Sequence, residues 1–561
     1  FIHDGLRLKG QISIVKGESS GENYKSPFSA EFLNTVYNSE IRMQEYLPIS
    51  KRGYLSMTDG SSLGYNGNIT LNYNTLFGEK HILYAGIGCE VKQDDSNSHG
   101  FTVTGFPDDR YSDPAFAIQF KENSRATSNE SKSRSIGFFA NGNYIFDDRY
   151  FADVSVRIDG SSKFGVDKRF APFWSVGAGW NVHNEKFFKT TKVSMLKLRY
   201  SYGVTGNQEF SAYQAQTMFQ FNTDRLYNSS VTAELMGYGN PNLEWQNQYQ
   251  SNFGVDFGYA KDRIRVQFNY YLKKTQGLLT TITVAPSLGF PSDKYTANLG
   301  EIQNKGLEVN LNAVIIRDME KEFEWSVMLQ VANNKNKIGK ISTALKTVND
   351  ENNRNAQVPG AVYEEGESMS AIKAVRSLGI DPTTGKELFV KKNGELTYTW
   401  DAEDKVICGD TEPKVFGNFG TNLYWRGWNL NLVFKYNLGA DYYNATLAQR
   451  VEGADPAKNA DRRVLKDRWK ESGQHALYKN IKDYKTTYIS SRFVQKDNTV
   501  QLSTLSLSYE VNKVWISRFG MNTLRLSFYM NDVFRASSVK NERGIDYPFQ
   551  RSFVFGLNVS F

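Results

Sequence analysis

The feature that most restricts the fold of this chain is a two-residue alternation of apolar and polar side chains. In the last segment every second residue is apolar: Phe553, Phe555, Leu557, Val559 and Phe561. A period of two places unlike side chains on the two faces of a β-strand. Segments 150–160, 263–284 and 428–438 show the same alternation. The chain is therefore predicted to be all-β.

Sixteen segments with this alternation can be distinguished along the chain. They are approximately 5–16, 66–77, 81–92, 135–146, 150–160, 173–184, 194–205, 245–258, 263–284, 305–317, 323–335, 417–426, 428–438, 498–511, 523–533 and 551–561. Strands of soluble sheets average about 5–6 residues, whereas a tilted strand that crosses a membrane needs about 9–11 residues. Because most of these segments have the greater length, they favour a membrane-spanning antiparallel β-barrel.

The links between the segments alternate strictly between short and long. Short links such as 147–149 and the single Gly427 are followed by much longer ones. Outer-membrane barrels have short periplasmic turns and long extracellular loops, whereas a soluble sandwich has no reason to sort its loops in this way. The longest links are therefore predicted to be extracellular: 17–65, 93–134, 206–244, 336–416 and 439–497.

Composition excludes several other classes of protein. No stretch approaches the roughly 20 apolar residues of a membrane helix. Two cysteines cannot form a disulfide framework, and the five histidines lack metal-ligand spacing. The net charge of +7 is small for 561 residues, which argues against a nucleic-acid partner.

Catalytic motifs are not found, so the chain is predicted not to be an enzyme and to need no cofactor or metal. The acidic segment 401–410 could bind calcium, but its spacing does not match an EF-hand, which favours a solvated turn.

Several segments resemble one family, the SusC-like TonB-dependent transporters of Bacteroidota. These segments include "YFADVSVRIDGSSKFG" (150–165), "NLGEIQNKGLEVNL" (298–311) and "GIDPTTGKELF" (379–389). The resemblance is collinear along the chain and extends to "YPFQRSFVFGLNVSF" (547–561). It implies a barrel of about 22 strands with a plug inside. We therefore expect this chain to hold the C-terminal part of the barrel, about sixteen strands, without the plug.

The first residue is Phe1, and no signal peptide precedes the first predicted strand. We expect the plug and the first strands to lie in a companion N-terminal fragment, either removed by cleavage or present as a separate chain. At the other end, the terminal aromatic residue resembles the signal by which insertion machinery recognises outer-membrane barrels. The five apolar residues of 553–561 are the candidates for that signal. An ordinary edge strand with an apolar end is the alternative.

The resemblance also implies a function and partners. It implies TonB-dependent import of a bulky nutrient, an oligosaccharide or an oligopeptide, through the outer membrane. The expected partners are a SusD-like lipoprotein lid, the TonB complex and outer-membrane lipid, with a dimer of transporter–lipoprotein pairs. A passive porin and an outer-membrane adhesin remain as alternatives, because either could have long loops on a barrel.

Candidate substrate contacts lie in the second long link, where aromatic rings could stack on sugars or on peptide side chains. They are Tyr442, Tyr443, Trp469 and Tyr478. The same rings could instead pack loop against loop or belong to the aromatic girdle at the membrane interface. Segment 454–473 is predicted to be a charged surface helix. Charged residues on the lumen side, among them Arg157 and Arg199, need partners, which could be the plug or water.

Overall fold

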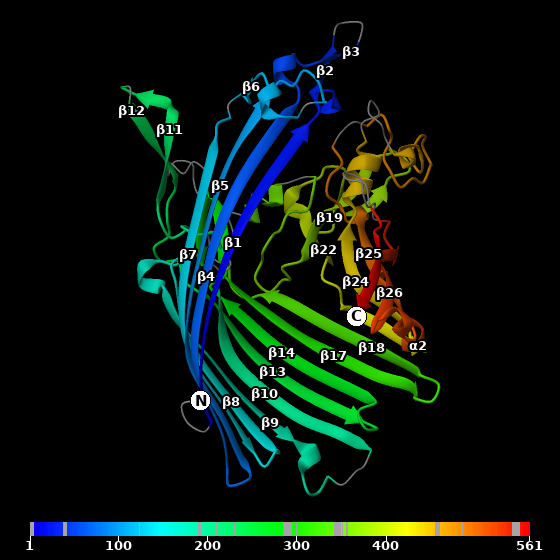
Figure 1. The fold of residues 1–561 in the computed structure, drawn as a ribbon. Helices are drawn as coiled ribbons and strands as arrows, with labels where there is room; N and C mark the ends of the chain where they lie inside the picture. The colour runs from blue at the N-terminus through cyan, green and yellow to red at the C-terminus, as the bar shows by residue number, and fades with distance from the viewer. Residues whose placement is uncertain are drawn as a thin grey trace.

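The computed structural model describes residues 5–561 except 38–41, 111, 123, 189–191, 209, 229, 284–293, 299, 342–348, 351, 355–356, 455–460, 484–485 and 541–549. Within the described residues, helices are too short or too polar to cross a bilayer. Most of the molecule is one large, strongly curved antiparallel sheet (Figure 1). The prediction of an all-β chain is therefore confirmed.

Long strands follow one another through this sheet in chain order. They are β1 (Leu6–Lys25), β4 (Tyr54–Phe77), β5 (His81–Thr104), β7 (Thr127–Phe146), β8 (Tyr150–Ser161), β9 (Phe170–Asn181), β10 (Val193–Asn207), β13 (Gln246–Tyr259), β14 (Ile264–Gln276), β17 (Glu301–Asp318), β18 (Phe323–Ile338), β23 (Val415–Trp425), β24 (Trp428–Tyr443), β25 (Val494–Glu510), β26 (Thr523–Ser537) and β27 (Phe553–Ser560). The short β6 (Gln119–Phe120) pairs with the end of β5 and completes a 17-stranded sheet. Each of the sixteen predicted segments overlaps one of the long strands.

Each long strand pairs with the next one in antiparallel register, from β1 with β4 to β26 with β27. Within the described residues, β1 pairs with β4 and β27 pairs with β26. The registers of these residues do not pair β1 with β27. The sheet therefore presents β1 and β27 as its two edges.

Smaller elements occupy the links. Additional strands are β2 (Leu33–Tyr37), β3 (Arg42–Tyr46), β11 (Met218–Tyr227), β12 (Ser230–Gly237), β15 (Leu279–Thr283), β16 (Lys294–Asn298), β19 (Ala371–Ile380), β20 (Glu387–Val390), β21 (Leu396–Thr397) and β22 (Lys405–Asp410). Short helices are η1 (Ala30–Phe32), η2 (Ile49–Lys51), η3 (Pro114–Phe116), η4 (Val166–Lys168), η5 (Val182–Asn184), η7 (Ala402–Asp404), η8 (Thr446–Glu452), η9 (Arg462–Leu465), η10 (Ser491–Phe493), α2 (Lys513–Ile516) and η11 (Ser517–Phe519). The elements of the long links lie at the rim opposite the short turns (Figure 1).

Four strands extend much farther than the alternation predicts. β1 continues to Lys25, β4 begins at Tyr54, β5 ends at Thr104 and β7 begins at Thr127. The links predicted as 17–65 and 93–134 are correspondingly shorter, because the long strands leave only 26–53 and 105–126 between them. The segment "GESSGENYK" (17–25) has Tyr24 as its only large hydrophobic residue and is mostly exposed, so it carries no alternation. A strand that rises out of the membrane has water on both faces and loses the two-residue pattern.

The central strands have two chemically different faces. In register, Phe268 of β14 lies opposite Val309 of β17, which lies opposite Val331 of β18. One residue away, Gln267, Asn310 and Gln330 are aligned in the same way on the other face. Residues directly opposite in a ladder share a face. One face is thus apolar and suited to lipid, and the other is polar and suited to water.

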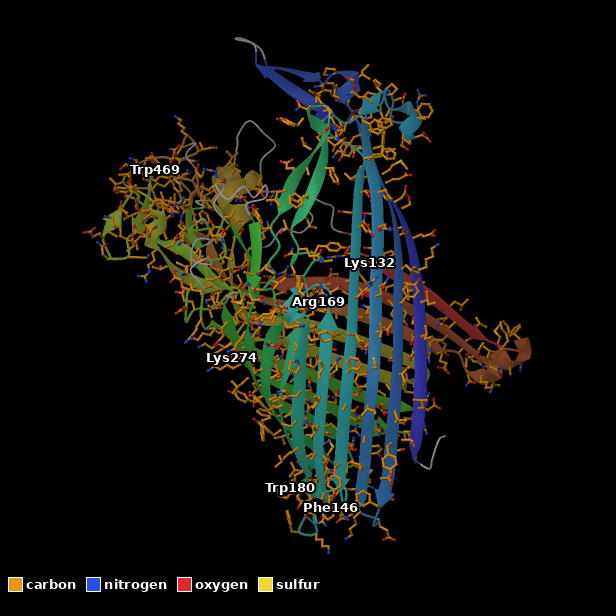
Figure 2. The ribbon with its side chains drawn as sticks, turned by 90° about the vertical axis from the view of Figure 1, so that its left-hand side faces the viewer. Lys132, Phe146, Arg169, Trp180, Lys274 and Trp469 are labelled. Carbon is orange, nitrogen blue, oxygen red and sulfur yellow. The ribbon has the colours of Figure 1, made fainter. Side chains whose placement is uncertain are left out.

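Aromatic rings gather at the short-turn rim of β4 to β9. His81 stacks on Phe77 with ring centroids 5.0 Å apart, and Tyr150 stacks on Trp180 at 6.4 Å. The Glu185 carboxylate accepts hydrogen bonds from the Tyr150 hydroxyl at 2.6 Å and from the Trp180 indole at 3.0 Å. Phe146 and Trp180 mark this rim in Figure 2. Such a belt matches the aromatic girdle of a barrel at a membrane interface.

The charged residues predicted to face the lumen find partners within the wall itself. Arg157 forms ion pairs with Glu90 at 3.0 Å and with Asp159 at 2.5 Å, and Arg199 pairs with Asp256 at 3.0 Å. Lys197 lies over the ring of Phe151 and Lys273 over that of Tyr271. Neither a plug nor water is required to neutralise Arg157 and Arg199. Three further charged residues expected on this face also have partners: Asp153 accepts from the Asn143 side-chain amide at 2.5 Å, Arg263 donates to the Ile315 oxygen at 3.1 Å, and Arg265 pairs with Asp262 at 2.8 Å.

Candidate functional site

The two longest links fold together into a packed body at the rim opposite the short turns. We call residues 371–410 and 444–493, where described, the rim unit. In it, β19 pairs with both β22 and β20, and β20 pairs with β21. A parallel bridge joins Val375 to Ser490, and the Ser377 amide donates to the Ser491 hydroxyl at 3.0 Å. The two links therefore form one unit with its own buried residues, which include Val375, Val451, Ile489 and Phe493.

A buried ion cluster lies at the centre of the rim unit. The Arg492 guanidinium pairs with Glu452 at 2.6 Å and with Glu387 at 2.9 Å. The side chain of Glu452 is 1% exposed, and its carboxylate also accepts from the Thr487 hydroxyl at 3.2 Å. Burial lowers the pKa of Arg492, but its hydrogen bonds and charge interactions with the two glutamates outweigh burial and raise that pKa. Because Glu387 belongs to one link and Glu452 to the other, this cluster holds the two links together.

A second buried arginine closes the loop that follows the π-helix η8. Arg468 donates to the backbone oxygens of Lys479 at 3.1 Å and of Glu452 at 2.9 Å, and also to those of Val451 and Val464. Burial lowers the pKa of this guanidinium. The segment 454–473 was predicted to be a helix, and that prediction is wrong for its described residues. Only the short η9 is helical there, because Arg468 bonds to the backbone groups of a compact loop; residues 455–460 lie outside the described residues.

The turn at "DPTTG" (381–385) is organised around one carboxylate. Asp381 accepts hydrogen bonds from the Tyr398 hydroxyl at 2.6 Å, the Thr383 amide at 2.9 Å and the Thr384 hydroxyl at 2.7 Å. These hydrogen bonds, led by that from Tyr398, lower the pKa of Asp381 to about 2. Gly385 has a φ of +70°, and a Cβ there would lie 2.5 Å from the indole of Trp469. The turn thus requires glycine both for its backbone conformation and for its contact with Trp469.

The four aromatic residues predicted to contact substrate have different surroundings. Trp469 (Figure 2) covers the Gly385 turn and donates from its indole nitrogen to the Pro382 oxygen at 2.8 Å. Its amide donates to the oxygen of Tyr478 at 3.0 Å, so these two residues are neighbours. Tyr442 and Tyr443 are consecutive residues of β24 and therefore point to opposite faces. Tyr443 packs edge-on against the ring of Phe493 at 6.1 Å.

Contacts within the protein are thus established for the rings of Trp469 and Tyr443. The hydroxyl of Tyr443 is buried and has no hydrogen-bond partner among the described residues. One face of the Trp469 indole is already occupied by backbone. The structure therefore brings Trp469 and Tyr478 together but does not gather all four residues on one surface. A role in substrate contact remains a prediction for each of them.

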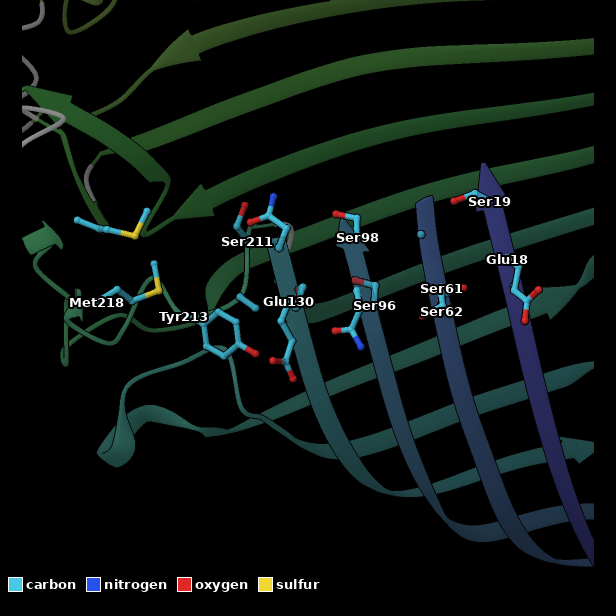
Figure 3. Close-up of a pocket in the computed structure, with 17 residues that line it drawn as sticks. Glu18, Ser19, Ser61, Ser62, Ser96, Ser98, Glu130, Ser211, Tyr213 and Met218 are labelled. Carbon is cyan, nitrogen blue, oxygen red and sulfur yellow. The ribbon is translucent and has the colours of Figure 1, made fainter. Parts of the chain in front are cut away.

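A cavity of about 730 Å³ lies against the tall wall formed by β1, β4, β5 and β7 (Figure 3). In register, Gly17, Ser62, Ser96 and Ser131 form one row of its lining, and Ser19, Gly60, Ser98 and Asn129 form another. Tyr213 lies beside this wall, and its hydroxyl accepts a hydrogen bond from the Lys132 amide at 2.9 Å. Met218 and Met236 of the β11–β12 hairpin complete the lining.

This serine-rich cavity was not predicted from the sequence. Its residues lie in 17–65, 93–134 and 206–244, which were all predicted to be loops. The clusters "GESSG" (17–21), "GSS" (60–62) and "SNS" (96–98) are visible in the sequence. These clusters become aligned only through the pairing of β1, β4, β5 and β7. They lie in the extended parts of those strands, which lack the apolar alternation.

The acidic segment 401–410 uses its carboxylates locally. Asp401 accepts from the Glu403 amide at 2.9 Å, and Asp404 accepts from the Lys392 amide at 3.0 Å. Asp410 accepts from the Ser370 hydroxyl at 2.7 Å. In the part of the chain that the structure describes, histidine, cysteine, aspartate and glutamate do not gather in groups of three or more that could hold a metal ion.

Apart from Val554, the last strand keeps its apolar residues on one face. Phe555 lies opposite Phe528 of β26 with ring centroids 5.1 Å apart, and Leu557 lies opposite Leu526. Phe553, Phe555 and Leu557 are all more than half exposed. This face continues the lipid-facing surface of the sheet, as predicted from the alternation.

The two-faced sheet and the aromatic belt at its rim are those of an outer-membrane β-barrel protein. The chain belongs to the family described as "TonB dependent receptor-like, beta-barrel", whose model matches residues 16–533. Members of this family are transport proteins rather than enzymes, which confirms the prediction that the chain is not an enzyme.

Comparison with individual proteins agrees with this family. The chain is 24% identical to TonB-dependent receptor P39 and 27% identical to TonB-dependent receptor P26, both of Formosa agariphila. The alignments cover 87% and 96% of this chain and 52% and 57% of those receptors. TonB-dependent receptor SusC of Bacteroides thetaiotaomicron is 24% identical over 100% of this chain and 54% of its own length. The resemblance to SusC-like transporters is thus confirmed, and the chain spans about half the length of these relatives.

Solved structures show the same fold. A chain of the RagAB peptide transporter superposes with a TM-score of 0.81 at 22% identity, covering 96% of this chain and 57% of that one. The RagAB peptide importer in its "open-open" state also gives a TM-score of 0.81, covering 100% of this chain and 59% of that one. Structural comparison therefore supports the same barrel fold that the sequence resemblance implied.

Proposed function

We propose that this chain is the C-terminal part of the barrel of a TonB-dependent importer of a bulky nutrient, an oligosaccharide or an oligopeptide. The observation that carries the proposal is a two-faced transmembrane sheet of the TonB-dependent receptor family with a packed rim unit above it. A polar lumen provides a route through the membrane, and the rim unit provides a rigid surface at its entrance. Import requires the receptor to bind the nutrient and let it pass, without breaking or forming covalent bonds in it.

The barrel of this importer is completed by strands of the same receptor that lie outside this chain. Support comes from β1 and β27, whose outer edges are unmatched in the registers of the described residues. Each backbone group left unsatisfied in hydrocarbon costs several kcal/mol, so the edges must be covered. About six further strands would give the roughly 22-stranded barrel of this class, whose wide lumen is plugged. The plug and these strands are assigned to an N-terminal part of the receptor.

The proposed partners follow from the same arrangement. A SusD-like surface lipoprotein covers the open end and rests on the rim unit, while the TonB complex acts on the plug from the periplasm. Pairs of transporter and lipoprotein associate as a dimer. The similarity to SusC and the fold shared with the RagAB peptide transporter support the lipoprotein partner and the dependence on TonB. Phe553, Phe555, Leu557, Val559 and Phe561 are proposed to serve as the insertion signal of the barrel.

Two groups of residues are proposed to contact the nutrient. The first is the aromatic set Tyr442, Tyr443, Trp469 and Tyr478. The second is the serine-rich cavity of the tall wall, whose hydroxyl groups can both donate and accept hydrogen bonds. Hydroxyl-rich surfaces suit a glycan as well as a peptide backbone, so both cargo classes belong in the test.

Growth of a strain that lacks the receptor gene tests the proposal. The strain is grown on a panel of single oligosaccharides and oligopeptides, with the intact gene restored as control. We expect loss of growth on one cargo class, and the same loss when TonB or the proposed lipoprotein partner is deleted. Growth that needs the receptor but not TonB would indicate a passive porin. Unchanged growth on every cargo, together with lost adhesion, would indicate an adhesin.

A further inference from the structure

A band of lysines lies on the lipid-facing side of the sheet, near its extracellular rim. In register, Leu272 of β14 is aligned with Lys305 of β17 and Lys335 of β18. One step higher, Lys274 is aligned with Gln303 and Lys337. Leu272 is 46% exposed and continues the apolar face of Phe268 and Tyr270. The lysines therefore point outward from the barrel, not into its lumen.

The height of the band matches the top of the hydrocarbon layer. On β14 the outward positions are apolar from Ile264, beside the short turn, to Leu272, and the next outward residue is Lys274. Ten residues of strand span about 33 Å, which a tilt of about 40° reduces to about 25 Å along the membrane normal. This is the usual height of the apolar band of an outer-membrane barrel. The lysines begin where lipid headgroups replace acyl chains.

The charge of the band is largely uncompensated. Lys274 pairs with Glu301 at 3.0 Å, and Gln303 also donates to that carboxylate at 3.2 Å. Lys305, Lys335 and Lys337 are exposed and have no acidic partner in the part of the chain that the structure describes. Lys305 and Lys335 lie opposite each other on neighbouring strands, about 5 Å apart in the pairing direction, and Lys337 lies two residues farther along β18. The three positive charges form a concentrated cationic surface.

The surroundings of these lysines are suited to a lipid headgroup. They line a hollow of about 780 Å³ together with Tyr202, Tyr249 and Leu272. Tyrosines are enriched where an apolar membrane meets water, because the ring is apolar and the hydroxyl is polar. Figure 2 shows Lys274 on the outer surface of the sheet, between the rim marked by Phe146 and Trp180 and the rim unit with Trp469.

We propose that Lys305, Lys335 and Lys337 bind the phosphate groups of an anionic glycolipid in the outer leaflet of the outer membrane. Ammonium groups pair with phosphate oxygens through charge-assisted hydrogen bonds. Leu272, in the same row as Lys305 and Lys335, and Leu307, in the next outward row toward the short turns, would contact the acyl chains of the same molecule. The proposal rests on the position of the chain in the outer membrane and does not require the import function.

Native mass spectrometry of the purified full-length receptor in detergent tests the proposal, with bis-phosphorylated lipid A as the probe. The variant K305Q/K335Q/K337Q is compared with K305R/K335R/K337R, which keeps the charge. The control is K386Q/K392Q/K470Q, which removes three exposed lysines from the rim unit. Heat-modifiable migration on a gel verifies that each barrel is folded.

A lysine near an anionic membrane surface is worth about 1 kcal/mol, which is about a five-fold change in affinity. We therefore expect the triple glutamine variant to bind the lipid about a hundred-fold more weakly. The arginine and rim-unit variants should bind like the unmodified receptor. Lipid A stripped of both phosphates should bind poorly to every variant. Equal retention of the lipid by the glutamine variant and the unmodified receptor would overturn the proposal. Displacement of the lipid by millimolar inorganic phosphate would also overturn it, because the band would then be a site for free phosphate.

Discussion

At the scale of single residues, Arg492 is the side chain on which the rim unit most depends. It neutralises Glu452 and Glu387, which come from different links and are almost completely buried. Replacing Arg492 with Met would leave two buried carboxylates without a cationic partner, and breaking a buried pair in this way costs about 3–5 kcal/mol. We expect hydrogen exchange in residues 371–410 and 444–493 to speed up greatly while the strands of the barrel keep their protection.

The matched control is Lys391→Met. Lys391 also pairs with a glutamate, Glu395 at 3.0 Å, but both side chains are well exposed. Exposed pairs of this kind contribute little to stability. Exchange in the rim unit should be unchanged in the control. Equal exchange in Arg492→Met and Lys391→Met would show that the buried cluster does not hold the two links together.

The carboxylate of Asp381 gives the rim unit a defined response to acid. Its folded-state pKa of about 2 is below the ordinary value of 3.8, chiefly because of its hydrogen bond from Tyr398. The ionised carboxylate therefore stabilises the folded turn fully above pH 3.8. This stabilisation is lost as the pH falls toward 2, because the carboxylate becomes protonated. Pepsin cleavage within 381–398 should accelerate between pH 4 and pH 2, after correction with an unstructured peptide. In Asp381→Asn the cleavage rate should already be raised at pH 4 and should change little below it; a rate that still climbs like that of the unmodified protein would contradict the assignment.

At the scale of elements, the two faces of β17 should tolerate charge very differently. Val309 faces lipid between Phe268 and Val331, whereas Asn310 faces the lumen between Gln267 and Gln330. An arginine facing lipid near the membrane midplane costs about 2–4 kcal/mol in a barrel. Val309→Arg should reduce the amount of folded receptor in outer-membrane fractions, measured by heat-modifiable migration. Asn310→Arg should assemble normally, and assembly that fails equally in both variants would reject the assigned strand phase.

The same difference between faces explains what could be predicted from the sequence. Alternation exists only where a strand has lipid on one side and water on the other, as in β14 and β17. There the segments 263–284 and 305–317 indicated strands. Above the membrane both faces of β1 are solvated, so "GESSGENYK" (17–25) carries no strand signal although it is paired throughout with β4. The serine-rich cavity depends on those extensions and was therefore missed.

The fold of the rim unit could not be predicted from the sequence, for a different physical reason. Its partners are distant in the chain: Arg492 is 40 residues from Glu452 and 105 residues from Glu387. Its strands are short and irregular, so no periodicity marks them. The aromatic residues in it were visible, but their surroundings were not, and Trp469 proves to lie against the turn at Gly385.

At the scale of the whole molecule, the rim unit forms one body from two links, and we expect it to move as one body during transport. The Ser377 amide donates to the Ser491 hydroxyl across the junction of the links. Ser377→Cys and Ser491→Cys, combined with Cys89→Ala and Cys408→Ala, allow the two links to be joined by a disulfide. Uptake of the nutrient should remain within about two-fold of the reduced form, because the disulfide only reinforces contacts that are already present. Uptake that falls on oxidation and recovers with reductant would mean that the links separate in each cycle. The rim unit would then be two moving parts instead of one.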